Sequence, residues 1–304
     1  MNHYPSNVKE KLNSIILSMA EHHWLFSKNP GHDFTRQHLG KLSFYDTMRL
    51  IISMGKGRTN DEIMDYFDLD PDLIPSQSAF CQRRRQISLS AFEYLFSEFS
   101  SSFPSTTDKF KDHCILACDG CHVVYATNSD IIEDYNKPRL IDYKGYNHMH
   151  LNGFVDVISK AFLDVVIQPR QQPDEREALH SMLDHFTPDD PQKYIITADR
   201  GYESYDLLFH CELKNLGYVF RVKSPSSPKS ILSYYASELP DDLEEFDVTI
   251  KRFFTDKATN IMKSQSDVYR YINPSKNTPH FYELLRKNHS HLYFLQFRVV
   301  KIKT

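Results

Sequence analysis

Two aspartates in this sequence each end an apolar run that is typical of a β-strand. Residues 113–118 lead into Asp119, and residues 194–198 lead into Asp199. When two such strands lie side by side in a sheet, their carboxylates can share a pair of divalent cations, which is an arrangement used for in-line phosphoryl transfer. Gly120 follows the first aspartate, and we expect it to open a turn. The two aspartates are therefore the first candidates for a catalytic site.

The composition limits what kind of protein this is. The chain has 304 residues, 40% of them hydrophobic, which is enough for two domains with sizeable cores. The formal net charge is -4, so any surface that binds nucleic acid must be local. Five cysteines are an odd number and do not suggest a disulfide framework. The sequence shows neither a secretory signal pattern at its start nor an apolar run of roughly 18 residues. We therefore expect a cytoplasmic protein without a membrane partner.

Residues 1–105 are predicted to form an all-helical region. Ser43 is the expected N-cap of one helix. The segment Thr59–Glu62 has the form of a capping box at the start of a second. Ser76 is expected to cap a third helix over residues 77–87.

The third of these helices carries three consecutive arginines, Arg83, Arg84 and Arg85. Two short helices, the second of them basic, resemble a helix-turn-helix unit with a recognition helix that binds DNA. An arginine run is also common on a solvated helix face, and the connection is longer than the usual turn of about three or four residues. Both interpretations, DNA contact and a solvated face, stay open.

The spacing of the apolar residues changes after a linker at residues 101–107. The expected elements are strands 113–119, 122–127, 150–158 and 161–168, helix 173–185, strand 194–199, helix 204–215 and strand 217–223. This order predicts an α/β protein with a mixed sheet flanked by helices, which is the element order of the ribonuclease H-like fold. The predicted core spans residues 106–304. It contains a β-rich insertion at about residues 224–290 and a last strand after it.

Several segments of this core carry a resemblance to a known family. They are Asp119-Gly120, Leu151–Ile158, Phe162–Pro169, Ile196–Ser204 and Tyr218–Lys223. Together they resemble the DDE transposases of bacterial insertion sequences. Within that family they are similar to the insertion-sequence-four type, whose core is interrupted by a β-rich insertion. The most specific element is the run from Ala198 through Asp199, Arg200 and Gly201 to Tyr202.

The resemblance implies cut-and-paste transposition, in which DNA is cleaved at the element ends and joined to target DNA. Asp119 and Asp199 would be ligands of two Mg²⁺ ions, with Mn²⁺ as a possible substitute. The implied partner is double-stranded DNA, both terminal repeats and target, bound by a homodimer at the bacterial nucleoid. Arg200 would face phosphate or pair with a neighbouring carboxylate. Lys144, in a polar loop with His148, would contact the DNA backbone or be solvated.

The third acid of the family lies on a late helix within the pattern Tyr-x2-Arg-x3-Glu-x6-Lys, and this sequence does not contain that pattern. Glu283 precedes the last expected strand and has the wrong arginine spacing, so it is a poor substitute. We therefore expect a chain that is incomplete at its C-terminus and inactive or barely active.

Two alternative functions stay open at this point. The chain could be a DNA-binding remnant without catalysis, or a metal-dependent nuclease of the same fold with a different third ligand. A zinc site near His113 and His122 is not expected, because Cys114 and Cys118 would lie on one face of an apolar strand. On the helix over residues 173–185, two histidines lie five residues apart, which is not the i,i+4 spacing of a helical metal pair.

Overall fold

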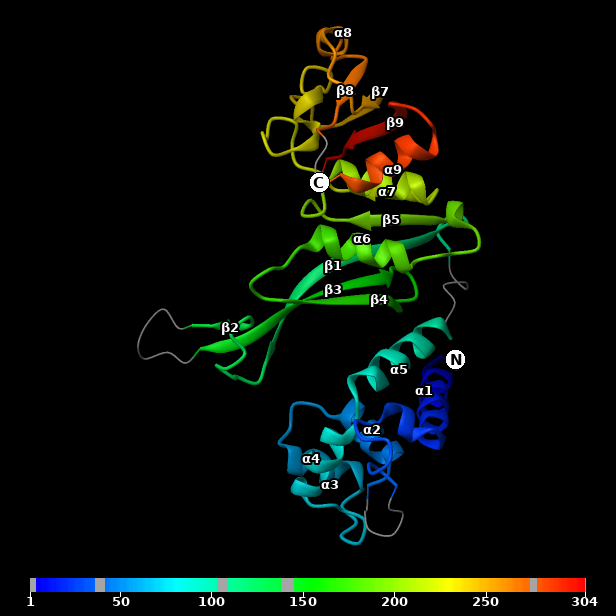
Figure 1. The fold of residues 1–304 in the computed structure, drawn as a ribbon, viewed down its shortest axis with the longest axis vertical. Helices are drawn as coiled ribbons and strands as arrows, with labels where there is room; N and C mark the ends of the chain where they lie inside the picture. Colours follow the sequence, from blue (N-terminus) through cyan, green and yellow to red (C-terminus); the bar gives the residue numbers. More distant parts are fainter. Residues whose placement is uncertain (1–3, 36–41, 103–108, 138–144, 274–277, 304) are drawn as a thin grey trace. The chain divides into compact units, whose positions relative to one another are not determined.

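The computed structural model describes residues 4–35, 42–102, 109–137, 145–273 and 278–303 (Figure 1). The chain divides into two compact units, Met1–Pro104 and Ser105–Thr304. No helix in the described ranges combines the length and the apolar composition that a membrane span requires.

The first unit is helical, as predicted. Its elements are α1 (Tyr4–Glu21), η1 (His23–Phe26), α2 (Phe44–Ser53), α3 (Thr59–Tyr66), α4 (Gln77–Gln86) and α5 (Leu89–Ser101). One apolar cluster joins α1, α2 and α5 and includes Ile16, Met19 and Met48. A second cluster joins α2, α3 and α4 through Leu50, Ile63 and Phe80. The basic helix α4 is therefore held in this unit by Phe80, which packs against α2 and α3.

Two of the predicted helix caps are confirmed. The Ser43 side chain accepts the backbone N–H of Asp46, and the Asp46 carboxylate accepts the backbone N–H of Ser43, which completes a capping box at the start of α2. The Ser76 hydroxyl accepts the backbone N–H of Ala79 at 3.2 Å and caps α4.

The capping box predicted at Thr59–Glu62 is wrong. Thr59 is the first residue of α3, Arg58 holds the N-cap position, and no side chain caps the helix there. The Glu62 carboxylate instead accepts the backbone N–H groups of Gly55 and Gly57, at 2.9 and 2.7 Å. Glu62 therefore accepts from donors in the preceding loop instead of from the backbone N–H at the start of the helix.

The second unit is built on a six-stranded mixed sheet. Its strands are β1 (Cys114–Tyr125), β2 (Tyr135–Asn136), β3 (Tyr146–Asp156), β4 (Phe162–Pro169), β5 (Tyr194–Ala198) and β6 (Gly217–Phe220). The order is β2-β3-β1-β5-β6, with β4 paired to β3. Strand β1 is antiparallel to β3 and parallel to β5, and β5 is parallel to β6. This mixed sheet with flanking helices confirms the predicted fold class.

Helices α6 (Glu175–His185) and α7 (Tyr205–Leu213) pack against this sheet, and the short η2 (Pro191–Lys193) leads into β5. The shared core contains Leu116 and Ile196 from the sheet, Leu179 and Met182 from α6 and Leu207 from α7, all fully buried. Burying these side chains fixes both helices on the sheet.

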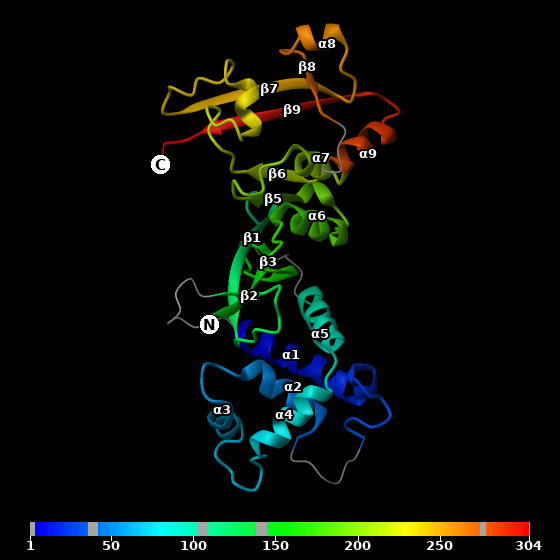
Figure 2. The same cartoon turned by 60° about the vertical axis from the view of Figure 1, so that its left-hand side comes forward.

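A smaller sheet follows in the β-rich region (Figure 2). It contains β7 (Phe246–Thr255), β8 (Tyr269–Tyr271) and β9 (Leu292–Lys301) in the order β8-β7-β9, with η3 (Ile231–Tyr235), α8 (Asn260–Ser264) and α9 (Pro279–Lys287). The last strand, β9, thus pairs with β7 of the insertion. Helix α9 packs on α7 through a cluster that includes Phe209, Phe281 and Leu284.

Two local predictions in the central sheet are wrong. Gly120 does not open a turn, because β1 continues through it to Tyr125 and pairs with β3 from Leu116 to Tyr125. The residues around His148 and His150 are not a polar loop. They lie in β3, where both rings are buried, and His150 is the cross-strand partner of His122.

Candidate active site

The two candidate aspartates lie side by side. In the parallel pair of β1 and β5, Cys118 is the partner of Ala198, and the next residue on each strand is an aspartate. Asp119 and Asp199 are both exposed. Each carboxylate is oriented by a nearby glycine: Gly120 N–H donates to Asp119 Oδ1 at 2.9 Å, and Gly201 N–H donates to Asp199 Oδ1 at 2.6 Å. The structure therefore brings together two carboxylates from positions 80 residues apart in the sequence.

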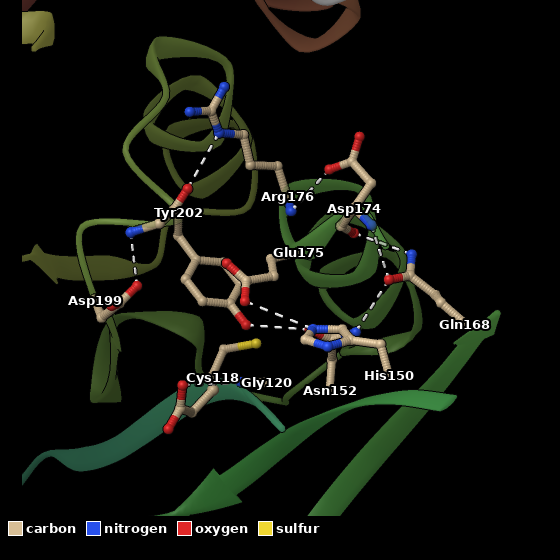
Figure 3. Close-up of polar contacts among 12 residues, drawn as sticks. Cys118, Gly120, His150, Asn152, Gln168, Asp174, Glu175, Arg176, Asp199 and Tyr202 are labelled. Carbon is tan, nitrogen blue, oxygen red and sulfur yellow. Dashed lines mark hydrogen bonds and ion pairs between the residues drawn. The ribbon is translucent and has the colours of Figure 1, made fainter. Parts of the chain in front are cut away.

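A third carboxylate, that of Glu175, approaches Asp199 from the first residue of α6 (Figure 3). A β-carbon built on Gly201 would stand 2.5 Å from Glu175 Oε2 and 2.9 Å from Asp199 Oδ1. The two carboxylates therefore face each other across a residue that must lack a side chain. The sequence showed Glu175 only as an acid in the first turn of a helix, and the fold is needed to see that this turn lies beside β5.

A chain of hydrogen bonds holds the start of α6 in this position (Figure 3). The Tyr202 hydroxyl donates to Asn152 Oδ1 at 3.3 Å, and Asn152 Nδ2 donates to Gln168 Oε1 at 3.2 Å. Gln168 Oε1 also accepts the backbone N–H of Asp174 at 3.0 Å, while Asp174 caps α6 by accepting the backbone N–H of Arg176. Strands β3 and β4 thus fix the helix end that carries Glu175.

The floor beneath the carboxylates is neutral. Burial raises the pKa of the Cys118 thiol to about 12, and the charges of Asp119 and Glu175 act in the same direction. Burial also raises the pKa of the Tyr202 hydroxyl, with the same two carboxylates contributing. Neither group ionises near neutral pH, so the thiol is not a nucleophile. The negative charge of the site resides in its carboxylates.

His150 is a buried polar side chain that sequence analysis did not assign to the site. It is only 5% exposed, and its Nε2 lies 3.6 Å from Glu175 Oε1. Neither ring nitrogen has a hydrogen-bond partner within the described part of the chain. An open pocket next to the carboxylates is lined by His122, His150, Pro173, Asp174, Glu175, Arg176 and Gly201.

The arginine triplet lies on α4 in the first unit. Arg83 is half-buried, stands over the Phe34 ring at 5.1 Å and donates to Gln86. Arg84 is exposed and lies 5.6 Å from the centre of the Phe80 ring. Arg85 is exposed. Arg83 and Arg84 therefore each lie over an aromatic ring, and Arg83 is the more buried of the two.

The remaining predicted residues lie apart from these contacts. Arg200 is exposed beside Asp199, and its backbone carbonyl accepts the Lys223 ammonium at 3.3 Å. Lys144 lies outside the described residues. Glu283 is exposed on α9, the helix that packs on α7 in the β-rich region.

The donor set at the strand ends fits a divalent cation. Mg²⁺ is a hard ion that takes one or two carboxylates and leaves its other positions to water and substrate phosphate. Asp119, Asp199 and Glu175 supply such oxygens, although no set of one oxygen from each lies within 4.8 Å of one another in this structure. A comparison with protein families finds that the model of the transposase DDE domain matches residues 110–291, a range that contains all three carboxylates. No curated protein matches the chain.

Proposed function

Because the chain belongs to the transposase DDE domain family, whose model matches residues 110–291, we propose that it cleaves DNA at the ends of an insertion sequence and transfers the cut strands to target DNA. The element is of the insertion-sequence-four type, and the reaction depends on Mg²⁺. One observation supports this most directly: Asp119 and Asp199 follow paired residues of adjacent parallel strands. Two carboxylates in that arrangement suit a pair of divalent ions.

The metal ligands in this proposal are Asp119, Asp199 and Glu175. Bound divalent ions would neutralise charge on the scissile phosphate and activate a water or a DNA 3′-hydroxyl. The chain itself orients the ligands, since the Gly120 and Gly201 N–H groups each hold one aspartate oxygen. The family pattern places its third acid on a late helix, whereas Glu175 lies on α6, before Asp199 in the chain. We propose that Glu175 substitutes for that acid and that the chain is active, contrary to the expectation of an inactive chain.

His150 is a positioning residue for Glu175 in this proposal. Its Nε2 faces Glu175 Oε1 at 3.6 Å, and its burial restricts the ring to that side of β3. The imidazole nitrogen can hold the Glu175 carboxylate in place. This role is lost in His150→Phe, which keeps a ring of similar size.

Contacts to double-stranded DNA are assigned to exposed cations. Arg84 and Arg85 on α4 and Arg200 beside Asp199 are exposed and can meet phosphates. Arg83 and Lys144 complete the proposed DNA-binding set. The partners are the terminal repeats and target DNA. A homodimer would hold the paired ends, and the activity would take place at the nucleoid.

The experiment uses the purified chain and a supercoiled plasmid that carries the DNA flanking this gene on both sides. Nicking and joining are followed on gels with Mg²⁺, with Mn²⁺ and with a chelator. We expect metal-dependent nicking that falls at least about 100-fold in Asp119→Asn and in Asp199→Asn. Asp189→Asn is the matched control, because Asp189 is an exposed acid in the loop before β5. Metal-independent nicking, or nicking that survives Asp119→Asn, would refute the proposal.

Glu175→Gln tests the contribution of Glu175 apart from that of Asp119 and Asp199. The amide keeps the size of the side chain and removes its charge, so we expect a loss close to that of the aspartate variants. An unchanged rate in Glu175→Gln would show that the aspartates act without it. Cleavage without joining would identify a nuclease, and DNA binding without cleavage would identify a non-catalytic protein.

A further inference from the structure

Three histidines from three different helices meet away from the carboxylate site. His180 lies on α6, His210 on α7 and His280 on α9. Each offers one ring nitrogen, and these three atoms lie within 4.8 Å of one another. In the ranges that the structure describes, this is the one group of three such residues that close together. Figures 1 and 2 show α7 beside both α6 and α9.

Each of the three rings turns one nitrogen toward a carboxylate. His280 Nδ1 lies 2.7 Å from Asp206 Oδ2, and His180 Nε2 lies 3.6 Å from the same oxygen. His210 Nε2 lies 3.2 Å from Asp184 Oδ1. The other nitrogens of His180 and His210, both Nδ1, face each other at 2.9 Å. Metal-binding histidines commonly have this arrangement, in which an outer carboxylate fixes the ring and leaves the inner nitrogen free for the ion.

A metal binds the neutral imidazole through the ring nitrogen that carries the lone pair. If both outer nitrogens carry their protons toward the carboxylates, the two Nδ1 atoms face each other with lone pairs. Two facing lone pairs repel each other, and a cation bound between the two nitrogens would replace this repulsion with attraction.

Asp206 supplies a second and independent observation. Its side chain is only 2% exposed, and its Oδ1 accepts the backbone N–H groups of His280 and Phe281 at 3.1 and 3.2 Å. Within the described residues it has no lysine or arginine partner, and its ion-pair contacts are all to histidine. A buried carboxylate without a cation is costly. A divalent ion on the neighbouring imidazoles would compensate its charge.

We propose that His180, His210 and His280 bind one Zn²⁺ ion, with Asp206 and Asp184 as the carboxylates that orient the rings. Three imidazole nitrogens favour Zn²⁺ and its transition-metal neighbours over Mg²⁺, so this site is chemically distinct from the one at the strand ends. A tetrahedral zinc shell needs nitrogen atoms about 3.4 Å apart, given Zn–N bonds of about 2.1 Å. In this structure the three rings are stacked, with interplanar angles of 9–18° and centroids 3.9–5.2 Å apart. A ring nitrogen binds a metal in the plane of its ring, so the proposal requires the rings to rotate until their nitrogens point at one ion.

The ion would join the β-rich region to the catalytic core. Helix α9 follows β8 in the β-rich region, whereas α6 and α7 cover the central sheet. One ion shared by these three helices would add a bond between regions that already meet through the apolar contacts of Phe209 and Phe281 and through the hydrogen bonds that Asp206 accepts from α9. It would also fix α6, whose first residue is Glu175. The inference does not depend on the proposed DNA chemistry.

The experiment uses the full chain without a histidine tag, freed of metal with a chelator. Zn²⁺ is titrated by calorimetry, and Co²⁺ is titrated while the visible absorption is recorded. We expect one ion per chain, a Co²⁺ spectrum of nitrogen and oxygen ligation, and a melting temperature that rises with Zn²⁺ but not with an equal concentration of Mg²⁺. The absence of a one-to-one Zn²⁺ complex in the unmodified chain would overturn the proposal without any variant.

Variants locate the ion. His280→Gln should weaken Zn²⁺ binding at least about 100-fold, by analogy with the loss of ligands and their partners at zinc sites. His185→Gln is the matched control. His185 ends α6, the helix that carries His180, but it is exposed and paired with Asp164. If His280→Gln is unfolded by circular dichroism, His180→Gln takes its place. Unchanged binding in a folded variant, or a near-ultraviolet band from thiolate ligation, would place the ion elsewhere and overturn the assignment.

Discussion

Gly120→Ala tests whether the site is packed as closely as the structure indicates. A β-carbon at position 120 would stand 2.5 Å from His150 Nε2 and 2.9 Å from Asn152 Oδ1. Both side chains are buried, His150 at 5% exposure and Asn152 at 0%, so neither can simply turn into solvent. Overpacking of this kind costs about 1–3 kcal/mol. Alanine also reduces the freedom of the unfolded chain, which returns about 0.4–1 kcal/mol. Because two buried groups are displaced at once, we expect a net loss of about 2 kcal/mol.

The assay is urea unfolding followed by two probes. Far-ultraviolet circular dichroism reports both units, whereas the single tryptophan, Trp24, lies in η1 of the helical unit. Gly120→Ala should lower the midpoint seen by circular dichroism and leave the Trp24 transition unchanged. Gly31→Ala is the control, because a β-carbon there would meet nothing within 4 Å. It should leave the dichroism transition of the second unit unchanged and change the stability of the first by less than about 1 kcal/mol.

A double mutant identifies the cause of the loss. His150→Ala removes the closest obstacle to the new methyl group, so the cost of Gly120→Ala should fall by about 1 kcal/mol or more in that background. Equal costs in the two backgrounds would show that His150 is not the group displaced. A single mutant as stable as the unmodified chain would refute the close packing of β1 against β3 at this point.

Three further predictions concern other parts of the chain. Phe281 is fully buried between α9 and α7. Phe281→Ala should therefore lower the free energy of unfolding, measured with urea, by about 3–5 kcal/mol. Burial raises the pKa of Glu203, but the pKa is lowered overall by hydrogen bonds from Ser230, Ile231 and Lys223. Its stabilisation is therefore present above the ordinary value of 4.5 and lost as pH falls through the lower folded value; Glu203→Gln should flatten the acid side of the melting temperature profile. Arg85→Ala should weaken plasmid DNA binding and reduce the slope of log affinity against log salt by about 1.

The element order of the second unit could be predicted from the sequence because alternation and helical spacing are local. Strands β3 to β6 and helices α6 and α7 all appear near their expected positions. The two aspartates could be chosen as well, since a carboxylate at the end of an apolar run is visible without a fold. That they are neighbours depends on the parallel register of β1 and β5, which the resemblance supplied and the local pattern did not.

Glu175 and the histidine group could not be predicted in this way. Glu175 reaches Asp199 only because β4 places the start of α6 beside the end of β5, through contacts of Gln168 and Asn152. His180, His210 and His280 lie on three helices, and no spacing within one helix brings them together. The i,i+4 rule argues against a pair within α6 but says nothing about partners on α7 and α9. Both misses have the same physical origin, since side-chain convergence between elements is set by tertiary packing.

The two glycines beside the aspartates show how a sequence signal can be correct in position and wrong in cause. Glycine after aspartate is a turn signal, because it permits backbone angles that other residues avoid. No glycine in the described chain has a positive φ, so neither Gly120 nor Gly201 is used for that freedom. Each instead leaves space, at Gly120 for His150 and Asn152, and at Gly201 for the carboxylates of Glu175 and Asp199. A close approach of functional side chains to the backbone requires glycine as strictly as a turn does. The Gly120→Ala measurement therefore also tests whether glycines next to these strand-end acids mark the walls of the site.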